Sequence, residues 1–108
     1  MRVLLDQGAP APLRRALVDH LVATVYERDW ARLTNGELLA AAEEAFDVFV
    51  TTDQNLRYQQ NLAGRRLAIL VLPTTSWPRL QPHAAAIAAA IVGLRPGELQ
   101  EWPFPNEG

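Results

Sequence analysis

Residues 67–72 read "LAILVL", and no polar side chain interrupts them. A strand with one solvated face alternates between apolar and polar residues. A continuous apolar run of this length is instead typical of a strand covered on both faces of a parallel sheet. Similar runs, rich in β-branched or apolar residues, occur at residues 2–5, 22–26 and 47–51. The sequence therefore predicts four strands in a buried, mainly parallel sheet.

Helical signals fall between these runs. Pro10 and Pro12 suit the first turn of a helix, because the N–H that proline lacks has no intrahelical partner there. Thr34 and Glu37 form the sequence pattern of a capping box, ahead of a stretch rich in Leu and Ala. The expected helices cover residues 10–21, 34–46, 54–64 and 82–92.

Strands and helices thus alternate along the chain, which predicts an α/β fold: a three-layer, doubly wound, four-stranded sheet with helices on both faces. Right-handed crossovers restrict the topologies, and a strand order of about 2-1-3-4 is the simplest. In that order the first and third strands are neighbours, and ligand sites lie beyond the carboxyl ends of the strands at this reversal. We expect one domain over residues 1–92 and an irregular tail over residues 93–108.

Composition excludes several kinds of chemistry. The 108 residues carry a formal net charge of −2, so strong non-specific attraction to nucleic acid or anionic lipid is not expected. The chain has no cysteine and no lysine. It therefore lacks a thiolate nucleophile, a cysteine zinc site and the lysine of a phosphate-binding P-loop, and we expect no nucleotide cofactor. The longest apolar stretch is too short to span a bilayer, so we expect a cytoplasmic protein without membrane attachment.

Two acidic residues follow strands that are neighbours in the expected sheet. Asp6 comes after the first strand and Asp53 after the third, so both would lie at one edge. They would be one or two strand spacings of about 4.8 Å apart. Carboxylates this close repel unless a cation or a proton lies between them. Glu37, in the first turn of the helix that leads into the third strand, would face the same crevice. Three oxygen ligands of this kind suit Mg²⁺ or Mn²⁺.

Each of these acids also has an ordinary structural explanation. Asp6 fits the start of a turn or a helix cap. Asp53 fits the N-cap of the helix expected next. Glu37 completes the capping box with Thr34, and that role would occupy its carboxylate. The sequence leaves both explanations open for all three residues.

Other polar and aromatic residues give weaker signals. Arg57, Arg65 and Arg66 flank the third expected helix and are candidates for contacts with an RNA phosphate backbone. A solvated helix face is the simpler explanation of these arginines. Trp30 fits packing better than base stacking. The two histidines are interpreted as structural residues near helix ends.

Three segments taken together resemble the small bacterial PIN-like proteins. They are "LLDQGAP" near the start, "WARLTNGELLAAAEE" in the middle and "FDVFVTTDQNL" after it. Their order matches a strand followed by an acid, a helix with acids in its first turn, and a strand ending in V-T-x-D. The resemblance covers roughly residues 2–92. It implies a doubly wound α/β fold and a Mg²⁺- or Mn²⁺-dependent ribonuclease, in many members the toxin of a toxin–antitoxin pair.

The resemblance also implies site residues, position by position. Asp6 matches the first acid of the family pattern and Asp53 matches the acid after the strand. Together with Glu37, which matches a later acid of the helix, they would be catalytic and metal-binding. The residues expected to give polar support are Asn35, Asn55 and Thr52. The first two of these are amides where the family pattern has acids.

Three functions remain open at this point. The first is a metal-dependent ribonuclease acting on RNA, with an antitoxin protein as partner. The second is a binding or regulatory PIN-like module without catalysis. It would hold a protein partner or a second copy in a homodimer, through the crevice or through residues 102–105, "WPFP". The third is a receiver-type phosphoacceptor domain, with Thr74 or Thr75 after the fourth strand. Its phosphate would need a lysine that the chain lacks.

Overall fold

The structure of the protein is a computed structural model, which describes residues 1–56, 62 and 64–104. The strands are β1 (Arg2–Leu5), β2 (Leu21–Thr24), β3 (Val48–Thr51), β4 (Ala68–Val71) and β5 (Leu99–Glu101). The helices of the described residues are α1 (Asn35–Ala45), α3 (Trp77–Leu80) and α4 (Ala84–Gly93), with 3-10 segments η1 (Ala11–Leu17) and η2 (Gln81–His83). The helix expected over residues 54–64 falls largely outside the described residues.

All the strands run parallel in one sheet, in the order β2-β1-β3-β4-β5. The register places Val3 between Val22 on one side and Val48 on the other. The expected order of the first four strands is confirmed, and so is the reversal between β1 and β3. The carboxyl ends of the strands consequently meet at one edge of the sheet, called the carboxyl edge below. The opposite edge is called the amino edge.

The prediction of four strands is wrong, because a fifth strand lies in the tail that we expected to be irregular. β5 follows a turn at Gly97, whose φ of 80° is unfavourable for a side chain. Leu99 pairs with Ile69 of β4, and only this one residue of the short strand is apolar. Its pairing therefore depends on the backbone of β4, which no local pattern in the tail records.

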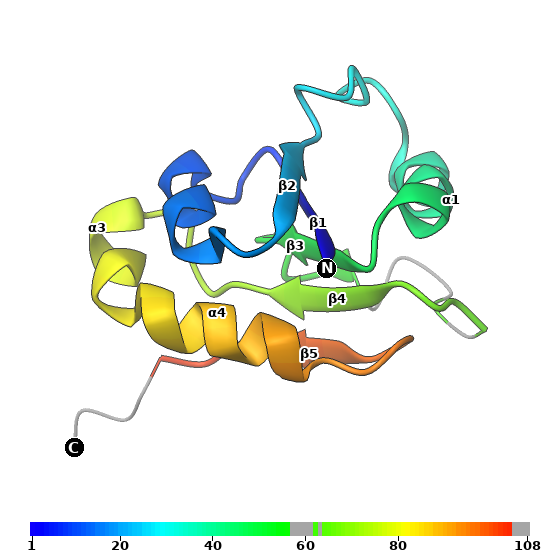
Figure 1. Ribbon diagram of the computed structural model, residues 1–108. Coiled ribbons are helices and arrows are strands. Elements are labelled where there is room, and N and C mark those ends of the chain that lie inside the picture. Colours follow the sequence, from blue (N-terminus) through cyan, green and yellow to red (C-terminus); the bar gives the residue numbers. More distant parts are fainter. Residues whose placement is uncertain (57–61, 63, 105–108) are drawn as a thin grey trace.

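Helices cover both faces of the sheet (Figure 1). On one face, side chains of η1, α3 and α4 pack against Val3, Val50 and Leu70. On the other face, side chains of α1 pack against Leu4 and Phe49. Successive strand residues point to opposite faces, so each central strand must be apolar throughout. The expected three-layer arrangement of the α/β fold is therefore present.

Residues 67–72 show this alternation directly. Ala68 and Leu70 face the layer of α4, whereas Leu67 and Ile69 face the layer of α1. None of the six residues is more than 4% exposed. The interpretation of "LAILVL" as a strand buried on both faces is confirmed.

The helices differ in detail from those predicted. The first is a 3-10 segment, η1, which opens after Pro10 without a side-chain cap. The last is divided into α3, η2 and α4, and prolines lie in the first turn of α3 and of η2. Proline in the first turn is compatible with a new helix but not with the continuation of an old one. None of the helices in the described ranges is long and apolar enough to cross a membrane.

Candidate functional site at the carboxyl edge

Asp6 begins the loop directly after β1. Its backbone N–H donates to the carbonyl of Val50, 2.9 Å away, so the ladder with β3 extends to this residue. One carboxylate oxygen accepts a hydrogen bond from the N–H of Gln7 at 2.9 Å. The other accepts from the hydroxyl of Thr51 at 2.7 Å. The side chain is half-buried, and both oxygens are therefore oriented by neighbours rather than free to rotate.

Thr51 links this acid to the next strand. It is the buried polar residue of the described chain, with no exposed surface, and it ends β3. Its hydroxyl donates to Asp6 and accepts from the backbone N–H of Asp53, 3.1 Å away. One buried hydroxyl thus contacts both residues that follow the neighbouring strands. The Thr51 hydroxyl thus joins the Asp6 carboxylate to the backbone of Asp53, at the carboxyl ends of two neighbouring strands.

Asp53 forms a local turn as well. Its carboxylate Oδ1 accepts from the N–H of Asn55 at 3.0 Å, and its carbonyl accepts from the N–H of Leu56 at 3.4 Å. Such a turn is a common use of Asp, and Asn55 takes part through its backbone. Among the described residues of this turn, one of the two carboxylate oxygens accepts a hydrogen bond. The turn and a role as a ligand are therefore compatible.

Gly8 allows the loop after β1 to approach the loop after β3. A Cβ at this position would overlap the hydroxyl oxygen of Thr52 and touch the methyl group of Thr75. A larger residue at Gly8 would therefore require the Thr52 side chain to move. Beside it lies a hollow of about 620 Å³, whose lining includes Asp6, Gly8, Thr75 and Tyr26. The hollow opens at the carboxyl edge, directly next to Asp6.

Glu37 is held in a helix cap. Its carboxylate accepts from the N–H of Thr34 at 3.0 Å, and its own N–H donates to the Thr34 hydroxyl at 3.3 Å. The hydrogen bond from the Thr34 backbone lowers the pKa of this carboxyl. Among the described residues, no group of three His, Cys, Asp or Glu side chains is placed to hold a metal ion. The structure therefore does not bring Glu37 to the pair of Asp6 and Asp53.

The remaining candidates lie elsewhere. Asn35 is the first residue of α1, next to the capping threonine. Arg65 and Arg66 precede β4 and therefore lie at the amino edge, where both contact Glu43. Arg57 lies outside the described residues. Trp30 packs edge-on against a phenylalanine ring at a centroid distance of 6.1 Å, in agreement with the packing interpretation.

Two residues of this site were missed by sequence reasoning. Thr51 was read only as the last residue of a strand, because threonine is itself a strand former. A usable signal was present, since Thr51 is the polar end of an otherwise apolar run. Gly8 could not be identified from the sequence, because its closeness to Thr52 depends on the pairing of two distant strands.

Comparisons of the whole chain with protein-family models, with curated proteins and with solved structures gave no match.

Proposed function

We propose that this chain is a PIN-like ribonuclease that depends on Mg²⁺ or Mn²⁺, with Asp6 and Asp53 at its centre. The observation that carries the proposal is the hydroxyl of Thr51, which contacts the residues after two neighbouring strands. These contacts lie where the strand order reverses, the usual place for a ligand in such sheets. The hydroxyl also fixes the orientation of the Asp6 carboxylate, which a bound cation would require.

The chemistry of the donors fits a hard divalent ion. Asp6 and Asp53 offer carboxylate oxygens, and Thr51 and Thr52 add hydroxyl oxygens nearby. Mg²⁺ is often held by one or two carboxylates, with water and substrate phosphate filling its other positions. A third acid is therefore not required. When bound, Mg²⁺ or Mn²⁺ would activate a water molecule and offset the charge of a phosphodiester.

The protein's own groups prepare this position. The Thr51 hydroxyl orients Asp6 without cancelling its negative charge, because a hydroxyl is a neutral donor. The hollow beside Asp6 has a volume of about 620 Å³, within the range of small-molecule pockets. It gives space for a nucleotide next to Asp6. Gln7 and Thr75 supply polar groups in its lining.

RNA cleavage in the presence of Mn²⁺ tests the proposal. The wild type should cleave a single-stranded RNA, and Asp6→Asn and Asp53→Asn should each abolish cleavage. Asp47→Asn is the matched control, because Asp47 is also an acid next to β3 but lies at the amino edge beside Arg2. This control should keep wild-type activity. Circular dichroism should show that all variants are folded.

Two results would overturn the proposal. One is unchanged cleavage in Asp6→Asn, which would assign the activity to a contaminant or to another site. The other is a folded wild type that cleaves no RNA although isothermal titration calorimetry shows that it binds Mn²⁺. Such a protein would have the ion site without the ribonuclease activity.

A second candidate is a PIN-like binding module without catalysis. It is favoured by the helix cap that holds Glu37 and by the amides at Asn35 and Asn55, which leave two acids at the site. Fewer charges bind divalent ions more weakly. Calorimetry that detects no Mn²⁺ binding would favour this function, whose partner would be an antitoxin or another protein.

A further inference from the structure

Tyr26 is an aromatic residue just after β2, at the carboxyl edge. It is 82% exposed, and it lines the hollow of about 620 Å³ that Asp6 also lines. Trp30, in the same loop, instead packs against Phe46 and beneath the guanidinium of Arg28. An exposed aromatic residue by itself needs no explanation. The loop, however, packs one of its rings against the fold and presents the other to the hollow.

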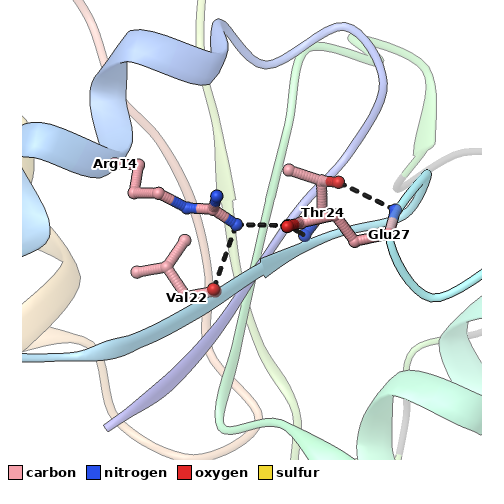
Figure 2. Close-up of polar contacts among 4 residues, drawn as sticks. All are labelled: Arg14, Val22, Thr24 and Glu27. Atoms are coloured by element: carbon pink, nitrogen blue, oxygen red, sulfur yellow. Dashed lines mark hydrogen bonds and ion pairs between the residues drawn. The ribbon is translucent and has the colours of Figure 1, made fainter.

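Hydrogen bonds between Thr24 and Glu27 fix the turn that carries Tyr26 (Figure 2). The N–H of Thr24 donates to the Glu27 carboxylate at 2.9 Å, and the N–H of Glu27 donates to the Thr24 hydroxyl at 3.0 Å. The guanidinium of Arg14 donates to the same carboxylate oxygen and to the carbonyl of Val22. The hydrogen bond from Arg14 lowers the pKa of Glu27, so the carboxylate remains an ionised acceptor at neutral pH.

The backbone on both sides of Tyr26 is anchored as well. Val25 is 2% exposed, and its N–H donates to the carbonyl of Leu5 at 2.9 Å. The carbonyl of Tyr26 accepts from the N–H of Asp29 at 3.0 Å. The ring is thus exposed on a backbone that is held in place, and a tyrosine side chain has only two torsion angles to immobilise. A ligand that covers the ring would therefore lose little binding free energy to ordering it.

The hollow offers different groups to the two parts of a nucleotide. The flat ring of Tyr26 matches the face of a base, and Asp6 would hold the phosphate through a divalent cation. Gln7 and Thr75, which also line the hollow, supply hydrogen-bonding groups for the edge of the base. A protein partner would also cover the ring, but it would bring no phosphate to the cation beside Asp6.

We propose that Tyr26 is the stacking platform for an unpaired base of single-stranded RNA, next to the phosphate that is cleaved. This inference rests on the proposed function for its RNA substrate. The base must be unpaired, because the bases of a duplex already stack on one another and are not free to cover a side chain. Stacking accepts every base, so the platform selects single strands and not a particular sequence.

Fluorescence anisotropy with a short labelled oligoadenylate tests the platform. The measurements are made in EDTA, so that neither a bound cation nor cleavage contributes. The wild type should bind this RNA about tenfold more tightly than the matching abasic oligonucleotide, which keeps the phosphates but has no base to stack. Tyr26→Ala should lose this preference. Tyr26→Trp should keep it, because an indole ring also stacks on a base.

Leu21→Ala is the matched control. Leu21 is 73% exposed and belongs to the same strand, but it begins β2 and therefore lies at the amino edge. This variant should keep the full preference for the oligoadenylate over the abasic oligonucleotide. The inference is overturned if the wild type binds the two oligonucleotides equally, which is the result expected if Tyr26 contacts a protein partner instead. It is also overturned if folded Tyr26→Ala keeps the preference, because the base would then bind elsewhere.

Cleavage in Mn²⁺ separates this inference from the proposed function. Tyr26→Ala should raise KM about tenfold and leave kcat nearly unchanged, because stacking holds the RNA equally before and during the reaction. A wild type that prefers the oligoadenylate in EDTA but cleaves no RNA would overturn the ribonuclease and keep the platform. Cleavage that depends on Asp6 but has an unchanged KM in Tyr26→Ala would overturn the platform and keep the ribonuclease.

Discussion

Acidic side chains lie at both edges of the sheet, but their partners differ. At the amino edge, Asp47 pairs with Arg2 at 3.9 Å, and Glu43 contacts both Arg65 and Arg66. At the carboxyl edge, Asp6 and Asp53 take part in no ion pair between described residues. Their hydrogen bonds come from the Thr51 hydroxyl and from backbone N–H groups.

This difference separates two uses of a carboxylate. An arginine partner cancels the charge of an acid and ties two elements together, as Glu43 ties α1 to the chain before β4. A hydroxyl or a backbone N–H orients an acid but leaves its charge in place. The amino edge therefore has acids that serve the fold. At the carboxyl edge, Asp6 and Asp53 are oriented by neutral donors, whereas Glu27, which follows β2, pairs with Arg14.

Removal of Glu43 should have the largest effect on stability. Its carboxylate accepts from the backbone N–H of Arg66 at 2.6 Å and pairs with the half-buried Arg65. Glu43→Ala would leave these donors without their acceptor, so the free energy of unfolding should fall by about 1–3 kcal/mol. Chemical denaturation measures this value. Asp6→Asn, at the other edge, should change it by much less, and an equal loss in both variants would contradict the distinction between the edges.

Substitution of Thr51 should have an intermediate effect. Thr51→Val keeps the shape but removes the hydroxyl between Asp6 and Asp53, at a cost of about 1 kcal/mol in stability. Because Asp6 would lose its orientation, Mn²⁺ affinity measured by calorimetry should also fall. Thr51→Ser keeps the hydroxyl and should restore the affinity. Loss of stability without loss of affinity in Thr51→Val would assign Thr51 to the fold alone.

Much of the fold could be predicted because burial on two faces leaves a strong sequence pattern. The run at residues 67–72 must be apolar on both sides, and no local alternative explains it as simply. β5 could not be predicted, because a strand with one apolar residue is held by the backbone of β4. Helix lengths were also misjudged at prolines, which can begin a helix as easily as they end one.

Only the part of the candidate site that depends on strand order could be predicted from the sequence. Strand order places Asp6 and Asp53 at one edge, and this followed from the alternation of strands and helices. The contact through Thr51 depends on side-chain geometry, which no spacing specifies. Glu27 and Glu37 also show that residue spacing does not specify side-chain geometry. Both complete the pattern T-x-x-E, but only Glu37 begins a helix, whereas Glu27 pairs with a distant arginine.

The exposed pair at the amino edge should matter less than either of these changes. Arg2 and Asp47 are about half exposed, so the ion pair itself contributes roughly 0–1 kcal/mol. Arg2→Gln should therefore shift the thermal midpoint only slightly. Asp47→Ala should cost more, because Asp47 also accepts from the backbone N–H of Arg2 at 2.8 Å. Equal shifts in both variants would mean that the ion pair, and not the backbone hydrogen bond, stabilises this edge.

The smallest expected effect is a pH dependence of stability that arises from Glu37. This residue lies in the first turn of α1, the helix that also carries Glu43. Hydrogen bonds from Thr34 lower the pKa of Glu37 below its ordinary value of 4.5. A lowered pKa in the folded state means that the ionised group stabilises the fold above pH 4.5, and that this contribution is lost as the pH falls through the lowered value.

Glu37→Gln keeps a capping side chain but cannot titrate. The wild type should therefore be slightly more stable than Glu37→Gln near neutral pH, and thermal unfolding should show the difference disappearing below pH 4.5. Glu44→Gln, an exposed change in the same helix, is the control for a general effect of charge. A difference that persists undiminished in acid would show that Glu37 acts through packing and not through its ionised carboxylate.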